Sequence, residues 1–295
     1  MDVLGTPGPD GSHVPGPIAG ARALLRHIYM SRIAVRWTVG DVSPWGYEAL
    51  ALSIAGALRT FGPSSHYVVC VNTLPLEQAA SRLGDVAARV ALLSVTRDRV
   101  PRFLLDRFDD ALAEGVGWKL APPRVFPECY ELSLDNDCVL WDVPRPLARA
   151  RREGRPLLAE DVRTCLGTFA PLCSGAPRNS GIRGLPPRFD LERELRRTLG
   201  ELDGTLRSEL DEQGLQVATM ERWSCDVVSL QEVSVCSPFP PHLPTLGRAG
   251  AHLVGLNAKT LPWEKDGRPA HELTREHFER LRGAVAARVR GDERP

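Results

Sequence analysis

The chain has 295 residues, of which 43% are hydrophobic and 25% are charged. This composition is typical of a soluble globular protein and argues against a disordered or fibrous one. Its 37 Lys and Arg residues balance 37 Asp and Glu residues, so no overall positive field exists to hold nucleic acid or an anionic membrane. Any anionic ligand must therefore be bound locally.

The apolar segments of the sequence are short. The longest one without a charge, residues 49–58, is about half of the roughly 20 residues that a membrane-spanning helix needs. The first thirty residues lack the long apolar region and the small-residue cleavage site of a secretory signal. None of the seven cysteines forms a C-x-x-C pair, so we expect reduced core cysteines in a cytoplasmic protein without a transmembrane segment.

In the first half, strand-like and helix-like segments alternate. Residues 1–29 are rich in Gly and Pro without apolar periodicity, which predicts a disordered tail and makes Met30 a candidate start residue. Beyond the tail, the patterns predict strands over 33–39, 67–72, 90–95 and 130–134, and helices over 49–58, 76–83 and 102–112. This alternation predicts a parallel sheet covered on both faces, in which ligands bind beyond the carboxyl ends of the strands.

After residue 145 the pattern becomes mixed. Further strands are expected over 156–159, 182–185, 227–235 and 251–256. The arginine cluster between 145 and 155 is expected to form a solvated face. Leucines at helical spacing predict one packed face, and they are Leu191, Leu195, Leu199, Leu202, Leu206 and Leu210. Thr274 is the expected N-cap of a last helix.

Two carboxylates end the fourth expected strand. Asp135 and Asp137 lie two positions apart, so on an extended chain they point to the same side, about 7 Å from each other. Hard oxygen ligands at the open end of a parallel strand suit Mg²⁺ or Mn²⁺ and leave room for the phosphate oxygens of a nucleotide. About one D-x-D is expected by chance in such a chain, so a solvated turn remains the alternative.

A second candidate group lies in residues 251–263. His252 stands in an apolar strand, where it is either a satisfied core residue or a ligand for Mn²⁺. Gly255 would allow the backbone to approach a phosphate closely. Lys259 is one of only three lysines in the chain.

In this order, these motifs resemble the GT-A-fold glycosyltransferases of the glycogenin and lipopolysaccharide galactosyltransferase type. The resemblance covers roughly residues 32–265 and implies an α/β fold, with a Rossmann-like, mostly parallel mixed sheet flanked by helices. It also implies retaining transfer from a UDP-sugar with Mn²⁺. The matching motifs are Thr38-Val-Gly-Asp41 with Tyr47, Lys119 and Arg124, Asp135-Asn-Asp137, Asn179-Ser180-Gly181, Glu212-Gln213, His252-x-x-Gly255, Lys259 and Pro262-Trp263.

The resemblance also implies a role for each of these residues. Uridine would be held by Thr38, Asp41 and Tyr47, and the metal by Asp135, Asp137 and His252. Gly255 and Lys259 would bind the diphosphate, with Lys119 and Arg124 also on the donor, while Asn179, Ser180, Glu212 and Gln213 would line the sugar and catalytic side.

The chain departs from the family at two of these motifs. Glu212-Gln213 stands where the family has Asp-Gln, and Asp211 is adjacent, so either carboxylate is a candidate to face the sugar. Lys259 lies seven residues after His252, one more than is usual in the family. Either a small bulge absorbs the difference or Asn257 takes part of the role of Lys259.

The resemblance implies one domain over residues 30–295, with a nucleotide-binding half (30–144) and an acceptor and catalytic half (145–295). This domain would move a sugar from a nucleotide-sugar donor to an acceptor hydroxyl of unknown identity. A sugar nucleotidyltransferase on a related sheet is one alternative, although the glycine-rich basic loop that it needs after the first strand is missing. A non-catalytic nucleotide-sugar-binding protein with the same fold is the other.

Overall fold

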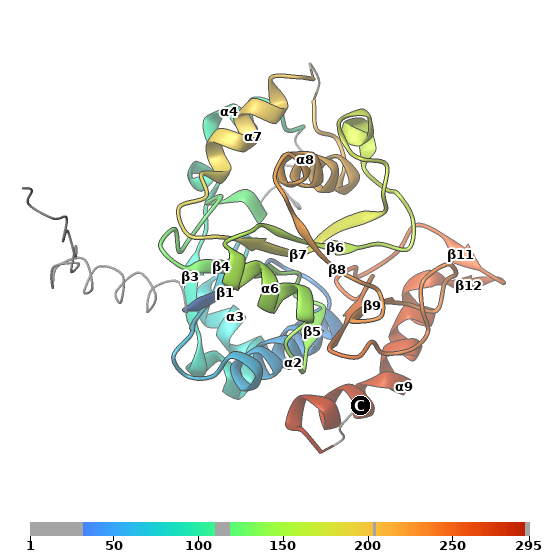
Figure 1. Cartoon of the computed structure of the whole chain (residues 1–295). Helices are drawn as coiled ribbons and strands as arrows, with labels where there is room; N and C mark the ends of the chain where they lie inside the picture. Colours follow the sequence, from blue (N-terminus) through green and yellow to red (C-terminus); the bar gives the residue numbers. More distant parts are fainter. Residues whose placement is uncertain (1–31, 110–118, 203–204, 293–295) are drawn as a thin grey trace, which may run out of the picture.

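One large sheet organises the chain. The computed structural model describes residues 32–109, 119–202 and 205–292. The expected tail over 1–29, Met30 and the end of the expected helix 102–112 lie outside the described residues. Across the sheet the strand order is β3-β2-β1-β4-β7-β6-β8 (Figure 1). These strands are β1 Ile33–Val39, β2 His66–Val71, β3 Ala91–Ser94, β4 Tyr130–Leu134, β6 Leu157–Glu160, β7 Arg178–Leu185 and β8 Asp226–Val228.

The direction of the strands confirms the mostly parallel mixed α/β fold. β1 pairs in parallel with β2 and β4, and β2 in parallel with β3. β7 runs antiparallel to both β4 and β6, whereas β6 and β8 are parallel. The carboxyl ends of β1, β2, β3 and β4 therefore lie at one edge, where ligands bind in open α/β sheets.

A smaller sheet adjoins that edge. It has the order β5-β10-β9, with β5 Cys138–Leu140, β9 Val233–Cys236 and β10 Gly250–Leu253. β10 is antiparallel to β5, and His252 lies opposite Cys138. This pairing brings a late strand beside the end of β4. A short hairpin follows, formed by β11 Glu264–Lys265 and β12 Arg268–Pro269.

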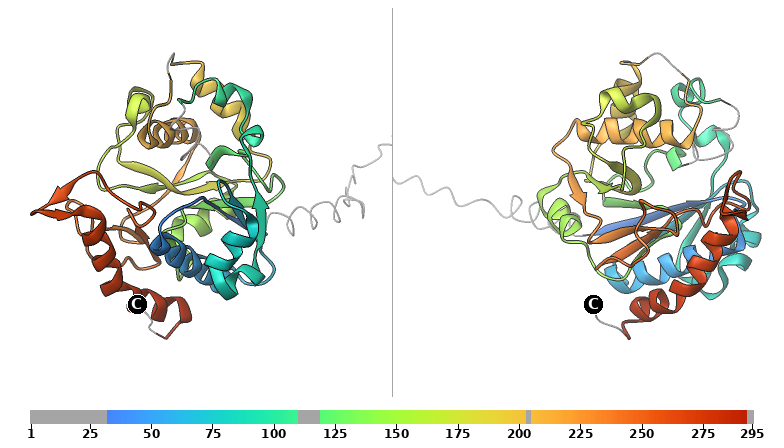
Figure 2. Two further views of the ribbon diagram at one scale, coloured as in Figure 1. Left: turned by 180° about the vertical axis from the view of Figure 1, so that it is seen from behind. Right: turned by 90° about the vertical axis from the view of Figure 1, so that its right-hand side faces the viewer.

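Helices cover both faces of the large sheet. Figure 1 shows α2 and α3 on one side and α7 and α8 on the other, and Figure 2 shows α9 beside α2. The α-helices are α2 Pro44–Phe61, α3 Leu76–Leu83, α4 Arg102–Leu105, α6 Arg145–Glu153, α7 Leu191–Leu199, α8 Glu209–Glu221 and α9 Ala270–Arg290. The short 3₁₀ helices are η1 Gly84–Arg89, η2 Arg97–Arg99 and η4 Gly167–Leu172. Within the described ranges, no helix has both the length and the apolar character needed to cross a membrane.

The central strands contribute side chains to a different apolar cluster on each face of the large sheet. Val35 and Trp37 pack with Leu50 of α2. On the other face, Cys70 of β2 packs with Leu215 of α8. Because successive strand residues point to opposite faces, each helix layer is packed against one side of the same strands.

The leucine repeat does not form one helix. α7 ends at Leu199 and α8 begins at Glu209, because Ser208 and Asp211 form a capping box that starts a new helix. Leu206 is nevertheless buried, in a bridge to Phe108. The helical spacing of the leucines continues past the end of α7, so the prediction of one packed helical face was wrong.

Three further expectations were wrong in their boundaries. Thr274 is not an N-cap, because α9 already begins at Ala270 and the Thr274 hydroxyl donates to the Ala270 carbonyl. The expected strand 227–235 is split between β8 and β9, which belong to different sheets. Of the expected helix 102–112, only Arg102–Leu105 is helical among the described residues.

The arginine cluster is more than a solvated face. It lies on α6 and the turn after it, where Arg149 Nε donates to Asp226 at 2.7 Å and Arg155 Nη2 lies 3.0 Å from the other carboxylate oxygen. Asp226 is buried at the start of β8. The pairing attaches α6 to the sheet, since a buried carboxylate needs a charged partner.

Two helical glycines test the packing of α2 on the smaller sheet. A Cβ at Gly56 would overlap the Leu140 carbonyl of β5, whereas Gly283 in α9 has open space around it. Gly56→Ala should lower the free energy of unfolding by roughly 1–3 kcal/mol through overpacking. Gly283→Ala should raise it by about 0.5–1 kcal/mol, because alanine is the better helix former. Urea denaturation measures both, and an equal effect of the two variants would contradict the packing described here.

Candidate functional site

Three ligand-type side chains meet at the carboxyl edge of the large sheet. Asp135 follows β4 and Asp137 precedes β5, while His252 arrives on β10. His252 Nε2 lies 3.6 Å from Asp135 Oδ2 and 3.3 Å from Asp137 Oδ1. One ligand atom from each residue lies within 4.8 Å of the others. The structure therefore brings together the three residues expected to hold a metal.

The chemistry of this group fits a divalent cation. Among the described residues the buried Asp137 Oδ1 accepts no hydrogen bond, although His252 Nε2 lies 3.3 Å away. A buried carboxylate oxygen is costly without a donor or a cation. Two carboxylates and an imidazole are ligands that Mn²⁺ accepts, and Mg²⁺ is bound through the same carboxylate oxygens. Burial opposes the charge of His252, but the adjacent carboxylates of Asp137 and Asp135 raise its pKa.

Lys119 adds a positive charge to the group. Its ammonium lies 2.7 Å from Asp135 Oδ1. Burial favours the neutral amine, but Asp135 and Glu212 outweigh it, so the pKa of Lys119 is raised. In turn, burial would raise the pKa of Asp135, but Lys119 and His252 lower it. An ammonium at this place can also contact an anion bound beside the carboxylates.

The β7 residues shape the floor beneath His252. Gly181 has no room for a side chain, because a Cβ would lie 2.5 Å from His252 Cε1 and 2.8 Å from Nδ1. Asn179 is buried and bridges the backbone: its Oδ1 accepts from Gly181 N at 3.0 Å, and its Nδ2 donates to the Glu160 carbonyl at 3.0 Å. Ser180 N donates to Gln213 Oε1 at 3.4 Å.

The structure separates the roles of Asp211 and Glu212. Asp211 caps α8 and accepts from Thr168 N at 2.8 Å and Arg207 N at 2.9 Å. Glu212 is instead buried, and it lies close enough to Lys119 and Asp135 for both of their charges to act on it. Asp135, Asp137 and His252 are called the metal-type group below. Glu212 is thus the carboxylate on the side of this group. Burial is the main reason why its pKa rises to about 7.

Two buried residues next to Glu212 were missed by the sequence analysis. Gln216 Nε2 donates to Glu212 Oε1, and Arg183 Nη1 donates to Gln216 Oε1. Gln216 lies one helical turn after Glu212 on α8, which is the spacing that places two side chains side by side. Arg183 follows Gly181 by two positions, so it lies on the same face of β7. These two spacings were the available signals.

Several residues expected to bind the nucleotide surround a separate pocket. Asp41, Tyr47 and Lys259 line a cavity of about 490 Å³ together with Arg82. Asp41 Oδ2 accepts from Lys259 Nζ at 2.6 Å and its Oδ1 accepts from Arg82 Nη1 at 2.8 Å. These hydrogen bonds lower the pKa of Asp41. Arg82, whose guanidinium lies 5.2 Å from the centre of the Tyr47 ring, was not predicted.

Asn257 contacts the metal-type group instead of sharing the place of Lys259. Its Nδ2 donates to Asn136 Oδ1 at 2.8 Å and to Asp137 Oδ2 at 3.4 Å. Gly255, in the turn between β10 and Asn257, has a φ of +91°, a conformation that favours glycine. The turn therefore fixes Asn257 beside Asp137.

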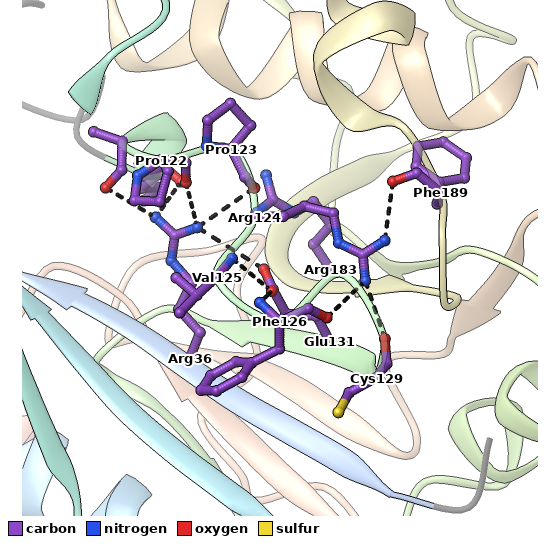
Figure 3. Close-up of polar contacts among 12 residues, drawn as sticks. Arg36, Pro122, Pro123, Arg124, Val125, Phe126, Cys129, Glu131, Arg183 and Phe189 are labelled. Carbon is purple, nitrogen blue, oxygen red and sulfur yellow. Dashed lines mark hydrogen bonds and ion pairs between the residues drawn. The ribbon is translucent and has the colours of Figure 1, made fainter. Parts of the chain in front are cut away.

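Two further expected site residues, Arg124 and Thr38, belong neither to the metal-type group nor to the lining of that pocket. Arg124 donates to the carbonyl oxygens of Phe126, Cys129 and Phe189 (Figure 3). It also donates to the Pro186 carbonyl. Its place is near the start of β4, whereas Lys119 reaches the end of that strand. Thr38 is half-buried on β1, opposite Cys70 of β2.

The close approach of Gly181 and His252 gives a test that needs no ligand. Gly181→Ala should destabilise the protein by roughly 1–3 kcal/mol, because the new methyl group displaces the imidazole ring. In a His252→Ala background the same change should cost much less, since the ring is gone. Urea denaturation of the four proteins measures the coupling. Additive effects of the two substitutions would contradict the contact.

The pKa of Glu212 predicts a pH dependence of stability. An ordinary Glu titrates near 4.5, but folded Glu212 titrates at about 7, so between these values the folded protein holds a proton that the unfolded chain has lost. The stabilisation is therefore full below about pH 4.5 and is lost as the pH rises to about 7, a change of roughly 3 kcal/mol. Glu212→Gln should remove this loss in unfolding experiments with EDTA. A pH-independent difference between the two proteins would contradict it.

The chain matches no protein-family model and no curated protein. Among solved structures, it is similar to an active-site mutant of LgtC, with 12% identity and a TM-score of 0.53 over 85% of this chain and 95% of that one. It is also similar to the galactosyltransferase LgtC in complex with donor and acceptor sugar analogues, with 12% identity, a TM-score of 0.51 and the same coverage. At this identity the likeness establishes the fold: the chain has the GT-A glycosyltransferase fold that its sequence predicted.

Proposed function

We propose that the protein is a metal-dependent glycosyltransferase that moves a sugar from a nucleotide-sugar, with a UDP-sugar as the expected donor, to an acceptor hydroxyl. One observation carries the proposal. Asp135, Asp137 and His252 converge at the carboxyl edge of a GT-A sheet, and within the described part of the chain the buried Asp137 Oδ1 accepts no hydrogen bond. Retention of anomeric configuration is proposed from the family resemblance alone.

The proposed chemistry is electrostatic. A divalent cation bound by Asp135, Asp137 and His252 would supply positive charge beside the diphosphate of the donor. Lys119 is the chain's own cation at this place, and it would stabilise the charge that grows on the departing diphosphate. Asn257 would hold Asp137 in the orientation needed for binding, since its amide donates to the other carboxylate oxygen.

The remaining expected residues are assigned to the two ends of the donor. We assign Asp41, Tyr47 and the unpredicted Arg82 to the nucleoside, because they line one pocket. Glu212 and Gln213 are assigned to the sugar, with Asn179 and Ser180 supporting them from β7. In this assignment residues 30–144 bind the nucleotide and residues 145–295 the acceptor, although His252 joins the metal group from the second half.

Binding of UDP with and without MnCl₂ tests the proposal. Isothermal titration calorimetry should show UDP binding that EDTA removes and Mn²⁺ restores. Asp137→Asn and His252→Ala should each weaken it by about tenfold or more, since the diphosphate is held partly through the ion. Asp142→Asn is the matched control, because this carboxylate is exposed and pairs with Arg248.

The alternatives give different results in binding and turnover assays. Full metal-dependent UDP binding by Asp137→Asn would contradict the metal site. Binding of UDP-glucose and UDP-galactose without any hydrolysis or transfer would indicate a non-catalytic binding protein. Release of pyrophosphate from UTP and a sugar phosphate would instead identify a nucleotidyltransferase.

A further inference from the structure

Arg36 is a fully buried charge in the centre of the large sheet. It lies on β1 and has no solvent-exposed area. Its neighbours Val35 and Trp37 belong to the apolar cluster on the α2 side, so Arg36 points to the α8 side. Burying a guanidinium is costly unless its donors are used. The contacts of Arg36 therefore show what this charge does.

The guanidinium holds a single short segment of the chain. Nη1 donates to the Pro122 carbonyl at 2.6 Å and to Pro123 at 3.4 Å, and Nη2 donates to Lys119 at 3.1 Å and Ala121 at 3.4 Å (Figure 3). All four acceptors are backbone oxygens within five residues. A planar fork with several donors can span such a set, whereas the single ammonium of a lysine cannot.

Glu131 holds the other end of the same segment. This carboxylate is fully buried on β4, and its Oε2 accepts from Val125 N at 2.8 Å and Phe126 N at 2.6 Å. Its Oε1 lies 3.9 Å from Arg36 Nη1. The two opposite charges thus compensate each other and bind the carbonyl and amide groups of residues 119–126 from the sheet below (Figure 3).

We infer that Arg36, with Glu131, is a positioning residue that sets Lys119 beside the metal-type group for contact with the donor diphosphate. Lys119 begins the held segment, its carbonyl accepts from Arg36, and its ammonium reaches Asp135 Oδ1 at 2.7 Å. The positioning stands on these contacts, while its use for a diphosphate rests on the proposed function.

The first measurement reports on Lys119 without any ligand. Trace acetylation with acetic anhydride, followed by peptide mass spectrometry, gives a separate rate for each lysine. Arg36→Lys should raise the rate at Lys119 roughly fivefold or more, because the segment opens more often. Glu131→Gln keeps an acceptor oxygen but removes the charge, and should act in the same direction if Arg36→Lys does not fold.

Arg59→Lys is the matched control. Arg59 also donates to two backbone carbonyls, those of Arg288 and Val289, but it joins α2 to the end of α9. Its substitution should leave the rate at Lys119 unchanged. An unchanged acetylation rate of Lys119 in both Arg36→Lys and Glu131→Gln would overturn the positioning role, irrespective of how the protein binds UDP.

The second measurement joins Arg36 to ligand binding. With MnCl₂ present, Lys119→Ala and Arg36→Lys should each weaken UDP binding by about tenfold, and the double variant should be no weaker than Lys119→Ala. Multiplying effects would show that Arg36 does not act through Lys119. Unchanged affinity in Lys119→Ala would overturn the contact with the diphosphate. A wild-type protein that does not bind UDP would refute the proposed donor, while the acetylation rates still decide the positioning role.

Discussion

Asp135 and Asp137 place two carboxylates on one turn, largely out of solvent, and such a pair is tolerated only where positive charge or hydrogen-bond donors lie beside it. Three separate parts of the chain supply these groups: Lys119 from the segment before β4, His252 from β10, and Asn257 from the turn after it. The position of the smaller sheet follows from the same need. Its pairing of His252 with Cys138 puts the imidazole directly beside the carboxylates.

The two faces of the large sheet differ in the charges that they bury. The α2 side is packed with apolar residues such as Val35, Trp37 and Leu132. On the α8 side, buried charges interrupt the apolar cluster: Arg36 and Arg183 come from the sheet and Glu212 from the helix. Burial lowers the pKa of Arg183 to about 10. Replacing such charges by apolar residues often stabilises a protein, so their presence here is better explained by the groups that they hold in place.

The close approach of the backbone limits the side-chain size at two positions beside the metal-type group. Gly181 lies beneath the His252 ring without space for a methyl group, and a Cβ at Gly46, at the start of α2, would lie 2.8 Å from Asn257 Oδ1. The main chain of β7 and of α2 therefore approaches the metal-type group directly. These contacts couple β7 to the position of His252 and the first turn of α2 to the position of Asn257.

The sequence by itself determined the elements whose signal is local. Short apolar runs predicted β1, β2 and β4, because neighbouring residues fix these patterns. The D-x-D predicted two carboxylates close together, although the structure places them on the turn between β4 and β5 and not on an extended strand. The order of the motifs was enough to predict the GT-A fold. Spacing alone could not show that the leucine repeat is divided between α7 and α8, since the capping box at Ser208 competes with a continuous helix.

Only the tertiary structure decided which distant residues meet. It shows that Asp211 caps α8, whereas the charges of Lys119 and Asp135 act on Glu212. It also shows that Arg124 donates to backbone carbonyls, including that of Phe189. It also revealed Arg36, whose role depends on carbonyl groups more than eighty residues away along the chain. Contacts of this kind depend on where the backbone of one segment lies against the side chain of another, and no pattern of neighbouring residues contains that information.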